Sequence, residues 1–464
     1  MRIHLIFILF VLQINALIAQ TLDYNEYLSW IVQEHPLMRN AKILEEKGQA
    51  QWLQTKGLFD PVLTSKWKNK FYSETNYYQQ SNTAISIPTP YAIGLLGQVD
   101  FNNGAYLNPD EYIPNTGLVS LGIQLPLLQG LMIDERRMAK KRATELITLS
   151  ELEMAMAINE LLYQSSLLYV DWYISEKKLT IQSSLLKAAT ERHEATKARF
   201  KGGDRAAIDT LESFIAKETR RQQYQDAQIE NIKSRFALVA FKNNDTEKDL
   251  ILNKRILPQD NSFNILLSTT MGIELAQNQM RQHPEMLWYQ TKSDILKIEE
   301  RWKKEKLKPK LNLEYHFLNK TTNDNPYYFS TENYRWGLDI QMPLFLREAR
   351  GDLKLQQLKI QENENATEWK RQQIQQKSNA LISQQEVLKN QFQIATQNSQ
   401  NSQLLSQGEL LKFNNGESSV FLMNQRENFQ LDQQQKALEY ERKWIQSHLD
   451  FRYVLFLPFS TEAQ

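Results

Sequence analysis

Four short segments of this chain alternate between apolar and polar residues, as β-strands do. The segments are residues 63–71, 119–125, 311–317 and 336–342. Successive side chains of a strand point to opposite faces, and alternation over about ten residues with aromatic residues near the ends is typical of a membrane β-barrel strand. The pattern predicts one β-hairpin at about 62–125 and a second at about 310–342.

The residues between the paired segments predict exposed turns. Residues 76–116 and 319–333 are rich in Asn, Tyr, Thr and Pro, as loops are. A single hairpin of this kind also fits a soluble domain. Two hairpins at matching positions of the chain favour strands that enter a membrane, four strands in all.

Two long segments lack helix breakers and predict very long helices. Residues 131–200 contain neither proline nor glycine, and residues 353–413 contain only Gly408. A seven-residue repeat of mostly apolar residues predicts left-handed supercoiling against a neighbouring helix. The repeat consists of Leu346, Leu353, Ile360, Thr367, Ile374, Leu381, Leu388 and Ala395. The other half of the seam is poor, with Ala349, Gln356 and Asn363, and Asn and Gln make up 28 of the 80 residues from Gln361 to Tyr440. One thin apolar seam with amide-rich remaining faces predicts helices that pack sideways and border water; a solvated rod is the alternative.

The chain carries this plan twice. His35-Pro36 returns as His283-Pro284, at the same offset that separates Pro61 from Pro309. The prolines at equivalent turns are Pro36 and Pro284, Pro61 and Pro309, and Pro126 and Pro343. Proline after histidine suits the first turn of a helix, where its missing N–H is not needed. The pattern predicts a first structural repeat at 20–260, a second at 261–458 and a short tail at 459–464.

The first 19 residues have the form of a secretory signal peptide. Arg2 precedes an apolar run from Ile3 to Leu12, and small residues lead to a cut after Ala19. A transmembrane anchor is the alternative, but the apolar run is shorter than the roughly 18 residues that a spanning helix needs. The predicted mature chain is therefore periplasmic, secreted or an outer-membrane β-structure.

The amino-acid composition excludes several classes of protein. The 464 residues include 55 Lys+Arg and 54 Asp+Glu, so a net charge of +1 gives no attraction to nucleic acid. No cysteine is present, which excludes disulfides, thiolate metal sites, a cysteine nucleophile and a lipoprotein anchor. Only 15 Gly and 13 Pro indicate few turns and long elements, unlike a globular enzyme.

The six histidines do not form a catalytic pattern. His35 and His283 precede prolines at equivalent turns, His193 is isolated on the predicted long helix and His316 lies on the polar face of a strand. Recognised hydrolase, zinc-protease and phosphate-loop motifs are missing from the sequence. We therefore predict no enzyme activity and no catalytic, cofactor or metal site.

Four strands cannot close a barrel, because the smallest membrane barrels have about eight. An open sheet edge in lipid leaves backbone N–H and C=O groups without hydrogen bonds. If the strands enter a membrane, several copies of the chain must share one barrel, and we expect a symmetric tubular oligomer.

The order of these motifs resembles the TolC-type outer membrane efflux proteins over essentially the whole mature chain. The most specific motif is Arg199-Phe200-Lys201-Gly202-Gly203, followed by Asp209 and Leu211. It matches the family's tip pattern, R-F-x-x-G before D-x-L. The two His-Pro motifs and the strand-end Leu125-Pro126-Leu127 and Met342-Pro343-Leu344 accompany it.

The resemblance implies a homotrimer with a twelve-stranded β-barrel in the outer membrane and an α-barrel of coiled-coil helices in the periplasm. It implies that the channel docks a periplasmic membrane fusion (adaptor) protein and, through it, an inner-membrane transporter of RND, ABC or MFS type. Substrates then pass outward by efflux or type I secretion, which the sequence does not separate. The main alternative is a soluble periplasmic coiled-coil adaptor or scaffold without a barrel.

The resemblance places adaptor docking at two helix tips, near 200–209 and 413–422. The docking residues it suggests are Arg199, Phe200, Gly203, Asp209, Leu211, Phe413, Gly416 and Leu422. Glycine permits the reversal between two helices, and Asp209 suits the positive start of the second helix, where its carboxylate could accept hydrogen bonds. Plain helix capping is the alternative role.

The second tip departs from the family pattern. Lys412 replaces the arginine, and Leu422 stands where the aspartate would be. In relatives, acidic residues at this tip can form a ring that binds cations. We therefore expect only weak block by divalent or trivalent cations.

Overall fold

The computed structural model describes residues 20–240, 248, 251–253, 256–268, 272–320 and 329–459. The predicted signal peptide and the predicted tail beyond Phe459 lie outside these residues. The chain divides into two compact units. The first consists of Met1–Lys42, Ala155–Pro284 and Arg371–Gln464, and the second of Ile43–Met154 and Glu285–Lys370. Each unit draws on both of the predicted repeats.

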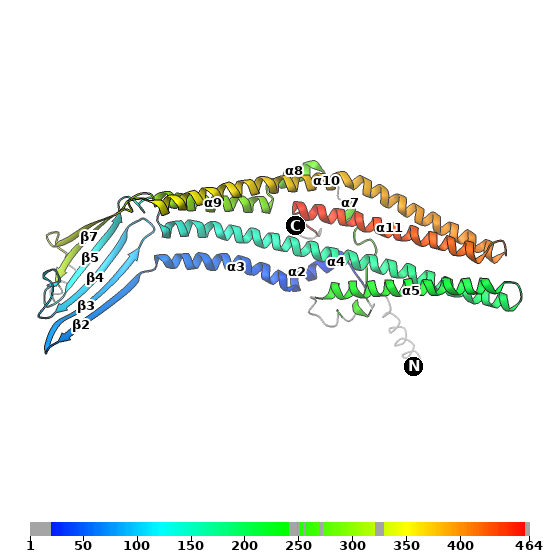
Figure 1. The fold of residues 1–464 in the computed structure, drawn as a ribbon, viewed down its shortest axis with the longest axis horizontal. Coiled ribbons are helices and arrows are strands. Elements are labelled where there is room, and N and C mark those ends of the chain that lie inside the picture. Colours follow the sequence, from blue (N-terminus) through cyan, green and yellow to red (C-terminus); the bar gives the residue numbers. More distant parts are fainter. Residues whose placement is uncertain are drawn as a thin grey trace, which may run out of the picture. The chain divides into compact units, whose positions relative to one another are not determined.

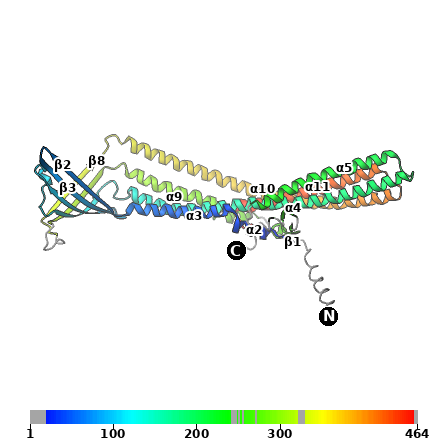
Figure 2. The ribbon, with the colours of Figure 1, turned by 90° about the horizontal axis from the view of Figure 1, so that it is seen from below.

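The second unit contains a six-stranded antiparallel sheet (Figures 1 and 2). Its strands, in hydrogen-bonded order, are β2 (Val62–Tyr72), β3 (Thr75–Pro88), β4 (Gly94–Asn103), β5 (Leu118–Pro126), β7 (Lys310–Lys320) and β8 (Tyr334–Gln341). The second predicted hairpin is confirmed, since β7 pairs with β8. The two segments predicted to pair in the first hairpin, β2 and β5, are not neighbours, because β3 and β4 lie between them. Strand β5 pairs with β7, so all six strands form a single sheet.

The prediction of four strands is wrong, because most of β3 and all of β4 lie in the segment predicted as an exposed turn. Thr and Tyr, which suggested a loop there, are also good strand formers. In β3 the apolar face is occupied partly by Ser81 and Thr83, so hydrophobic alternation is weak along the sequence. The β2–β3 connection is a two-residue turn in which Ser73 and Glu74 both have positive φ, 52° and 61°, as in a type I′ hairpin.

The six repeat prolines occupy the ends of elements, as predicted. Pro36 and Pro284 are the first residues of α3 (Pro36–Lys56) and α9 (Pro284–Glu305). Pro61 and Pro309 immediately precede β2 and β7, while Pro126 ends β5 and Pro343 follows β8. Proline at these positions lacks only an N–H that the regular element would not have used.

The predicted long helices are present as α4 (Glu135–Lys201), with 67 residues, and α10 (Arg347–Asn414), with 68. The seven-residue seam of α10 is buried or half-buried throughout. Most Asn and Gln side chains of α10 are exposed, as predicted, but two beside the seam are not. Gln356 and Asn363 are buried, and their side-chain amides donate hydrogen bonds to the backbone carbonyls of Leu296 (2.9 Å) and Tyr289 (3.1 Å) in α9.

The first unit combines the other ends of α4 and α10 with several shorter elements. These are β1 (Gln20–Leu22), α2 (Tyr24–Glu34), α5 (Ala207–Val239), β6 (Ile256–Pro258), α7 (Asn264–Ser268), α8 (Ile273–Met280) and α11 (Val420–Leu455). Strands β1 and β6 pair in parallel. The elements α4–α5 and α10–α11 form two helical hairpins, as the repeat predicts. In the described residues no helix is both long enough and apolar enough to span a membrane.

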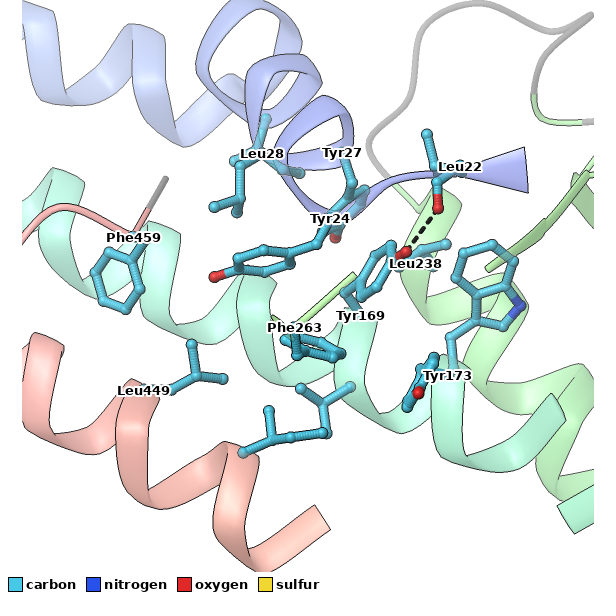
Figure 3. Packing of buried hydrophobic residues seen from close by; sticks show 14 of the residues in the cluster. Leu22, Tyr24, Tyr27, Leu28, Tyr169, Tyr173, Leu238, Phe263, Leu449 and Phe459 are labelled. Carbon is cyan, nitrogen blue, oxygen red and sulfur yellow. Dashed lines mark hydrogen bonds between the residues drawn. The ribbon is translucent and has the colours of Figure 1, made fainter. Parts of the chain in front are cut away.

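The core of the first unit is aromatic (Figure 3). Tyr24 of α2 and Tyr169 of α4 meet edge to face with ring centroids 5.5 Å apart, and Phe263 lies 5.1 Å from Tyr24. The buried Tyr169 hydroxyl donates a 2.6 Å hydrogen bond to the carbonyl of Leu22. Burial raises the pKa of Tyr169, so this hydroxyl stays protonated as a donor.

His35 and His283 have structural roles, as predicted. The Nδ1 atom of His35 accepts a 3.1 Å hydrogen bond from the backbone N–H of Leu37 at the start of α3. The Nε2 atom of the buried His283 donates to the carbonyl of Val454 in α11 at 2.8 Å. His35 thus satisfies a backbone group at the start of α3, and His283 one in the last turn of α11.

Candidate functional site

The two helix tips of the first unit are closed by the same backbone motif. At the first tip the N–H of Gly203 donates to the carbonyl of Phe200, and the N–H of Asp204 to that of Arg199, both at 3.0 Å. Gly416 and the residue after it repeat these bonds at the second tip. The φ angles of Gly203 and Gly416 are +81° and +83°, the left-handed conformation that a Schellman cap requires. The predicted role of both glycines in reversing the chain is confirmed.

Three of the predicted docking side chains are exposed. Phe200 at the end of α4, Leu211 in the first turns of α5 and Leu422 in the first turn of α11 are 43%, 59% and 45% exposed. No other part of the described chain buries these apolar side chains. They are available to a partner.

Phe413 is not available, contrary to its prediction as a docking residue. Its side chain is only 3% exposed. The guanidinium groups of Arg199 and Arg205 lie 5.7 and 4.9 Å from the centre of its ring, a cation–π arrangement. Arg199 also donates to the carbonyl of Asn414 at 3.4 Å. Arg199 and Phe413 thus tie the first tip to the second.

Asp209 does not cap its helix through the predicted hydrogen bonds. It lies in the first turn of α5, but the residue before that helix, Ala206, is the N-cap and no side-chain cap hydrogen bond is present. The carboxylate of Asp209 lies 4.0 Å from the guanidinium of Arg205 instead. A true cap is found at the second tip, where the Ser419 hydroxyl accepts the N–H of Leu422 at 3.2 Å.

Two exposed apolar residues at the tips were missed by sequence reasoning. Ile208 and Phe421 are 70% and 55% exposed, and each is the second residue of its helix, α5 and α11. A usable signal exists, because the offset between Ile208 and Phe421 is the one that separates Gly203 from Gly416. Both repeats therefore present an apolar side chain at the same point of the tip.

Below the tips a buried polar network joins the two helical hairpins. Arg192 of α4 donates to the amide oxygen of Asn424 in α11 at 2.9 Å and forms a buried ion pair with Glu427. Arg220 of α5 donates to Asn428 at 2.8 Å. Burial lowers the pKa of Arg220, and the negative charge of Glu427 opposes this effect. The network fixes the position of α11 against α4 and α5.

The sheet of the second unit has one apolar and one polar face. A hydrogen-bonded row on the apolar face passes through Leu63, Ile85, Gly97, Leu121, Phe317 and Tyr334. Trp67 and Trp336 on this face are 76% and 60% exposed. On the opposite face, Lys66 lies in a row with Asn82 and Asp100.

The polar face is closely packed at one point. Gly122 of β5 lies opposite His316 of β7. The ring of His316 covers Gly122 so closely that a Cβ atom at residue 122 would overlap it. This contact requires glycine and holds the two hairpins of the sheet in register.

Metal binding finds no support among the residues that the structure describes, where no group of three or more His, Asp or Glu side chains could hold an ion. At the second tip the carboxylate of Glu409 is engaged within the chain. It accepts a hydrogen bond from Ser418 and lies 3.8 Å from the guanidinium of Arg426.

Solved structures share this fold, although no family model and no curated protein matches the sequence. VceC, an outer membrane protein of Vibrio cholerae, is 12% identical, with a TM-score of 0.67 over 94% of this chain and 96% of that one. The CmeC outer membrane channel of Campylobacter jejuni is 13% identical, with a TM-score of 0.65 over 95% and 88%. The open state of the Neisseria gonorrhoeae MtrE outer membrane channel is also 13% identical, with a TM-score of 0.65 over 95% and 90%.

At these identities the likeness establishes the fold. The chain has a TolC-like fold over nearly all of its length, which confirms the predicted fold class in its coarse form. The similar structures are described as outer membrane proteins or channels.

Proposed function

We propose that this protein is the outer-membrane exit channel of a tripartite export system and works as a homotrimer. Its signal peptide, residues 1–19, directs it out of the cytoplasm, and its sheet enters the outer membrane as part of a barrel. The long helices extend into the periplasm, and the helix tips dock an adaptor protein. An inner-membrane transporter of RND, ABC or MFS type supplies the energy through that adaptor.

The observation that carries this proposal is the amphipathic sheet. One face exposes Trp67, Trp336 and Ile340, the last of them to 68%. In water such a face would be a strong aggregation site, whereas in lipid it is the favourable outer surface of a barrel. The opposite polar face then lines a water-filled path.

The helix tips supply the second half of the proposal. They present exposed apolar side chains around two glycine reversals, and the cation–π contacts of Phe413 hold the tips together. Apolar anchors surrounded by polar residues are the usual centres of protein interfaces. A helical hairpin of an adaptor is the partner that suits them.

Membrane fractionation and planar bilayers test the function. The full-length protein should remain with outer membranes after carbonate and high-salt washes. The purified trimer should insert into planar bilayers and conduct ions in discrete steps. A chain that washes off and never conducts would instead be the soluble periplasmic scaffold that is the main alternative.

Efflux and type I secretion share this architecture. The transporter that accompanies the channel selects the substrate, so the exported compound follows from the partner. Co-purification with a transporter of the drug-efflux or of the peptide-secretion class separates the two.

A further inference from the structure

Two edges of the sheet have no strand partner within the described chain. Strand β2 is bonded only to β3, and β8 only to β7. Resting on the channel function proposed above, we infer that β8 of each copy pairs with β2 of the next and that all six strands of each copy enter the barrel. Three copies then form a barrel of about eighteen strands, rather than the twelve expected from four strands a copy.

A second copy of this chain is the partner that suits both edges. All neighbouring strands are antiparallel and their number is even, so β2 and β8 run in opposite directions. A ring of copies therefore continues the same antiparallel ladder across every junction. Both edge strands carry a tryptophan on the apolar face, Trp67 and Trp336, so that face stays continuous across the junction.

Strands β3 and β4 belong to this barrel because they continue both faces of the sheet. In β4, Leu95 and Val99 extend the apolar face, opposite Ile123 and Val119 of β5. On the polar face, the Asp100 carboxylate accepts hydrogen bonds from Gln98, at 2.8 and 2.9 Å, and from the adjacent strand β3. A twelve-stranded barrel would require β2 to pair directly with β5. That pairing would break the β2–β3 ladder and the β4–β5 ladder.

The stagger of the sheet also fits closure. The row that starts at Leu63, near the beginning of β2, ends at Tyr334, the first residue of β8. If Tyr334 pairs with Phe71 of the next copy, the row advances about eight residues over six strands, a tilt of about 42° at about 3.3 Å per residue and about 4.8 Å per strand. Closed barrels have tilts of about 35–45°.

Charge selects this register among those that keep the faces in phase. It places Lys66 opposite Asp339 of the next copy, although Lys70 then lies opposite Arg335. The register shifted by two residues, with a tilt of about 35°, offers no opposite-charge pair and sets Lys68 against Arg335. Further shifts give tilts of about 25° or about 49°, outside the range of closed barrels.

The consequence is a wider duct through the membrane. Barrel diameter grows roughly linearly with strand number, so eighteen strands give a barrel roughly 1.5 times as wide as twelve. The additional polar side chains of β3 and β4, among them Asn82, Gln98 and Asp100, then line the interior.

Disulfide mapping tests the junction between β8 and β2. The chain contains no cysteine, so no native thiol can form a competing disulfide. Full-length Lys66→Cys/Asp339→Cys is assembled in outer membranes and oxidised with copper phenanthroline. We expect covalent dimers and trimers on non-reducing gels. Trp67→Cys/Asp339→Cys is the matched control, since its two cysteines lie on opposite faces, and it should stay monomeric in denaturing gels. A trimer on native gels that never cross-links through β2 and β8 overturns the proposed junction.

The place of β3 and β4 is tested in the unmodified protein. Electron cryomicroscopy of the trimer in lipid nanodiscs should show eighteen strands in cross-section, and twelve strands would overturn the inference. Spin labels at Val99→Cys and Gln98→Cys give a second readout: we expect lipid access at position 99 and water access at 98, and water access at both counts against it. A conducting trimer with twelve strands disproves only this inference, whereas a chain that neither inserts nor conducts disproves the channel function itself.

Discussion

At the scale of single residues, buried polar side chains connect the helices as much as apolar packing does. Arg192 and Glu427 form an ion pair with side-chain exposures of 5% and 6%. Removing one partner of such a pair leaves the other charge buried and uncompensated, which is more costly than never having the pair. The same reasoning applies to buried histidines, which must stay neutral.

We predict that Arg192→Ala lowers the free energy of unfolding by about 3–5 kcal/mol. Urea unfolding of the detergent-solubilised protein, followed by circular dichroism, measures this change. Lys197→Ala, on the exposed surface of α4, is the control and should change stability by less than about 0.5 kcal/mol. The double variant Arg192→Met/Glu427→Leu should recover much of the loss. A double variant as unstable as Arg192→Ala would show that the charge is not the cause.

Stability should also fall at mildly acidic pH. Burial lowers the pKa of His35 and of His448 below the ordinary value of 6.5. Near pH 6 the unfolded chain therefore binds more protons than the folded one, and stability decreases as the pH falls below about 6.5. Protonation also removes the Nδ1 acceptor that His35 offers to the N–H of Leu37.

Melting temperatures at pH 7.5 and pH 5 check this. The wild-type protein should melt lower at pH 5, and His448→Gln should show a smaller difference between the two values. An unchanged difference in that variant would assign the pH dependence to other groups.

At the scale of elements, each helical hairpin ends in a tip that is rigid inside and apolar outside. The Schellman caps at Gly203 and Gly416 fix the backbone, and Phe413 beneath two arginines joins the tips. Phe200, Ile208 and Leu211 remain exposed. A surface of this kind binds a partner with little loss of its own conformational entropy.

We predict that Phe200→Asp/Leu211→Asp weakens adaptor binding at least tenfold, about 1.4 kcal/mol or more. Biolayer interferometry with an adaptor that co-purifies with the protein measures the affinity. Gln222→Asp, an exposed position of α5 away from the tip, controls for added charge. Unchanged affinity in the tip variant would move the docking site elsewhere.

At the scale of the whole molecule, the proposed membrane location of the sheet requires assembly. Both of its edge strands need partners in a membrane, since lipid offers no hydrogen bonds to the backbone. A purified protein that stayed a single subunit in mild detergent and in lipid would contradict the homotrimer. In a symmetric trimer, a charged residue at the tip occurs once in each copy, so the copies together form a ring of charge.

The tips of the proposed channel should therefore bind cations weakly. Leu422 stands where an acidic residue would be needed, and Glu409 nearby is already engaged with Ser418 and Arg426. In single-channel recordings, millimolar magnesium or hexaamminecobalt on the periplasmic side should leave the conductance within about twofold, because uncharged rings attract cations little. Leu422→Asp, which adds one carboxylate per copy, should introduce block at lower cation concentrations. Micromolar block of the wild-type channel would contradict this.

The sequence alone determined the local features of this protein. Proline at element starts, glycine at the two reversals and uninterrupted helical stretches act on their own segments, so their effects could be read in chain order. The seven-residue seam of α10 and the strong alternation in β5 and β8 likewise predicted which side chains share a face. The tip glycines followed from the same reasoning, whereas the three exposed tip residues followed from the resemblance to a known family.

Only the tertiary structure decided the features that depend on distant partners. Strand β3 has weak hydrophobic alternation of its own and is held by its ladders to β2 and β4. Phe413 is buried because Arg199 and Arg205, two hundred or so residues earlier, cover its ring. The amides of Gln356 and Asn363 are buried because backbone carbonyls of α9 accept their hydrogen bonds. Long-range pairing is set by geometry that no single segment contains, and that geometry also fixes the number of strands in the sheet of each copy.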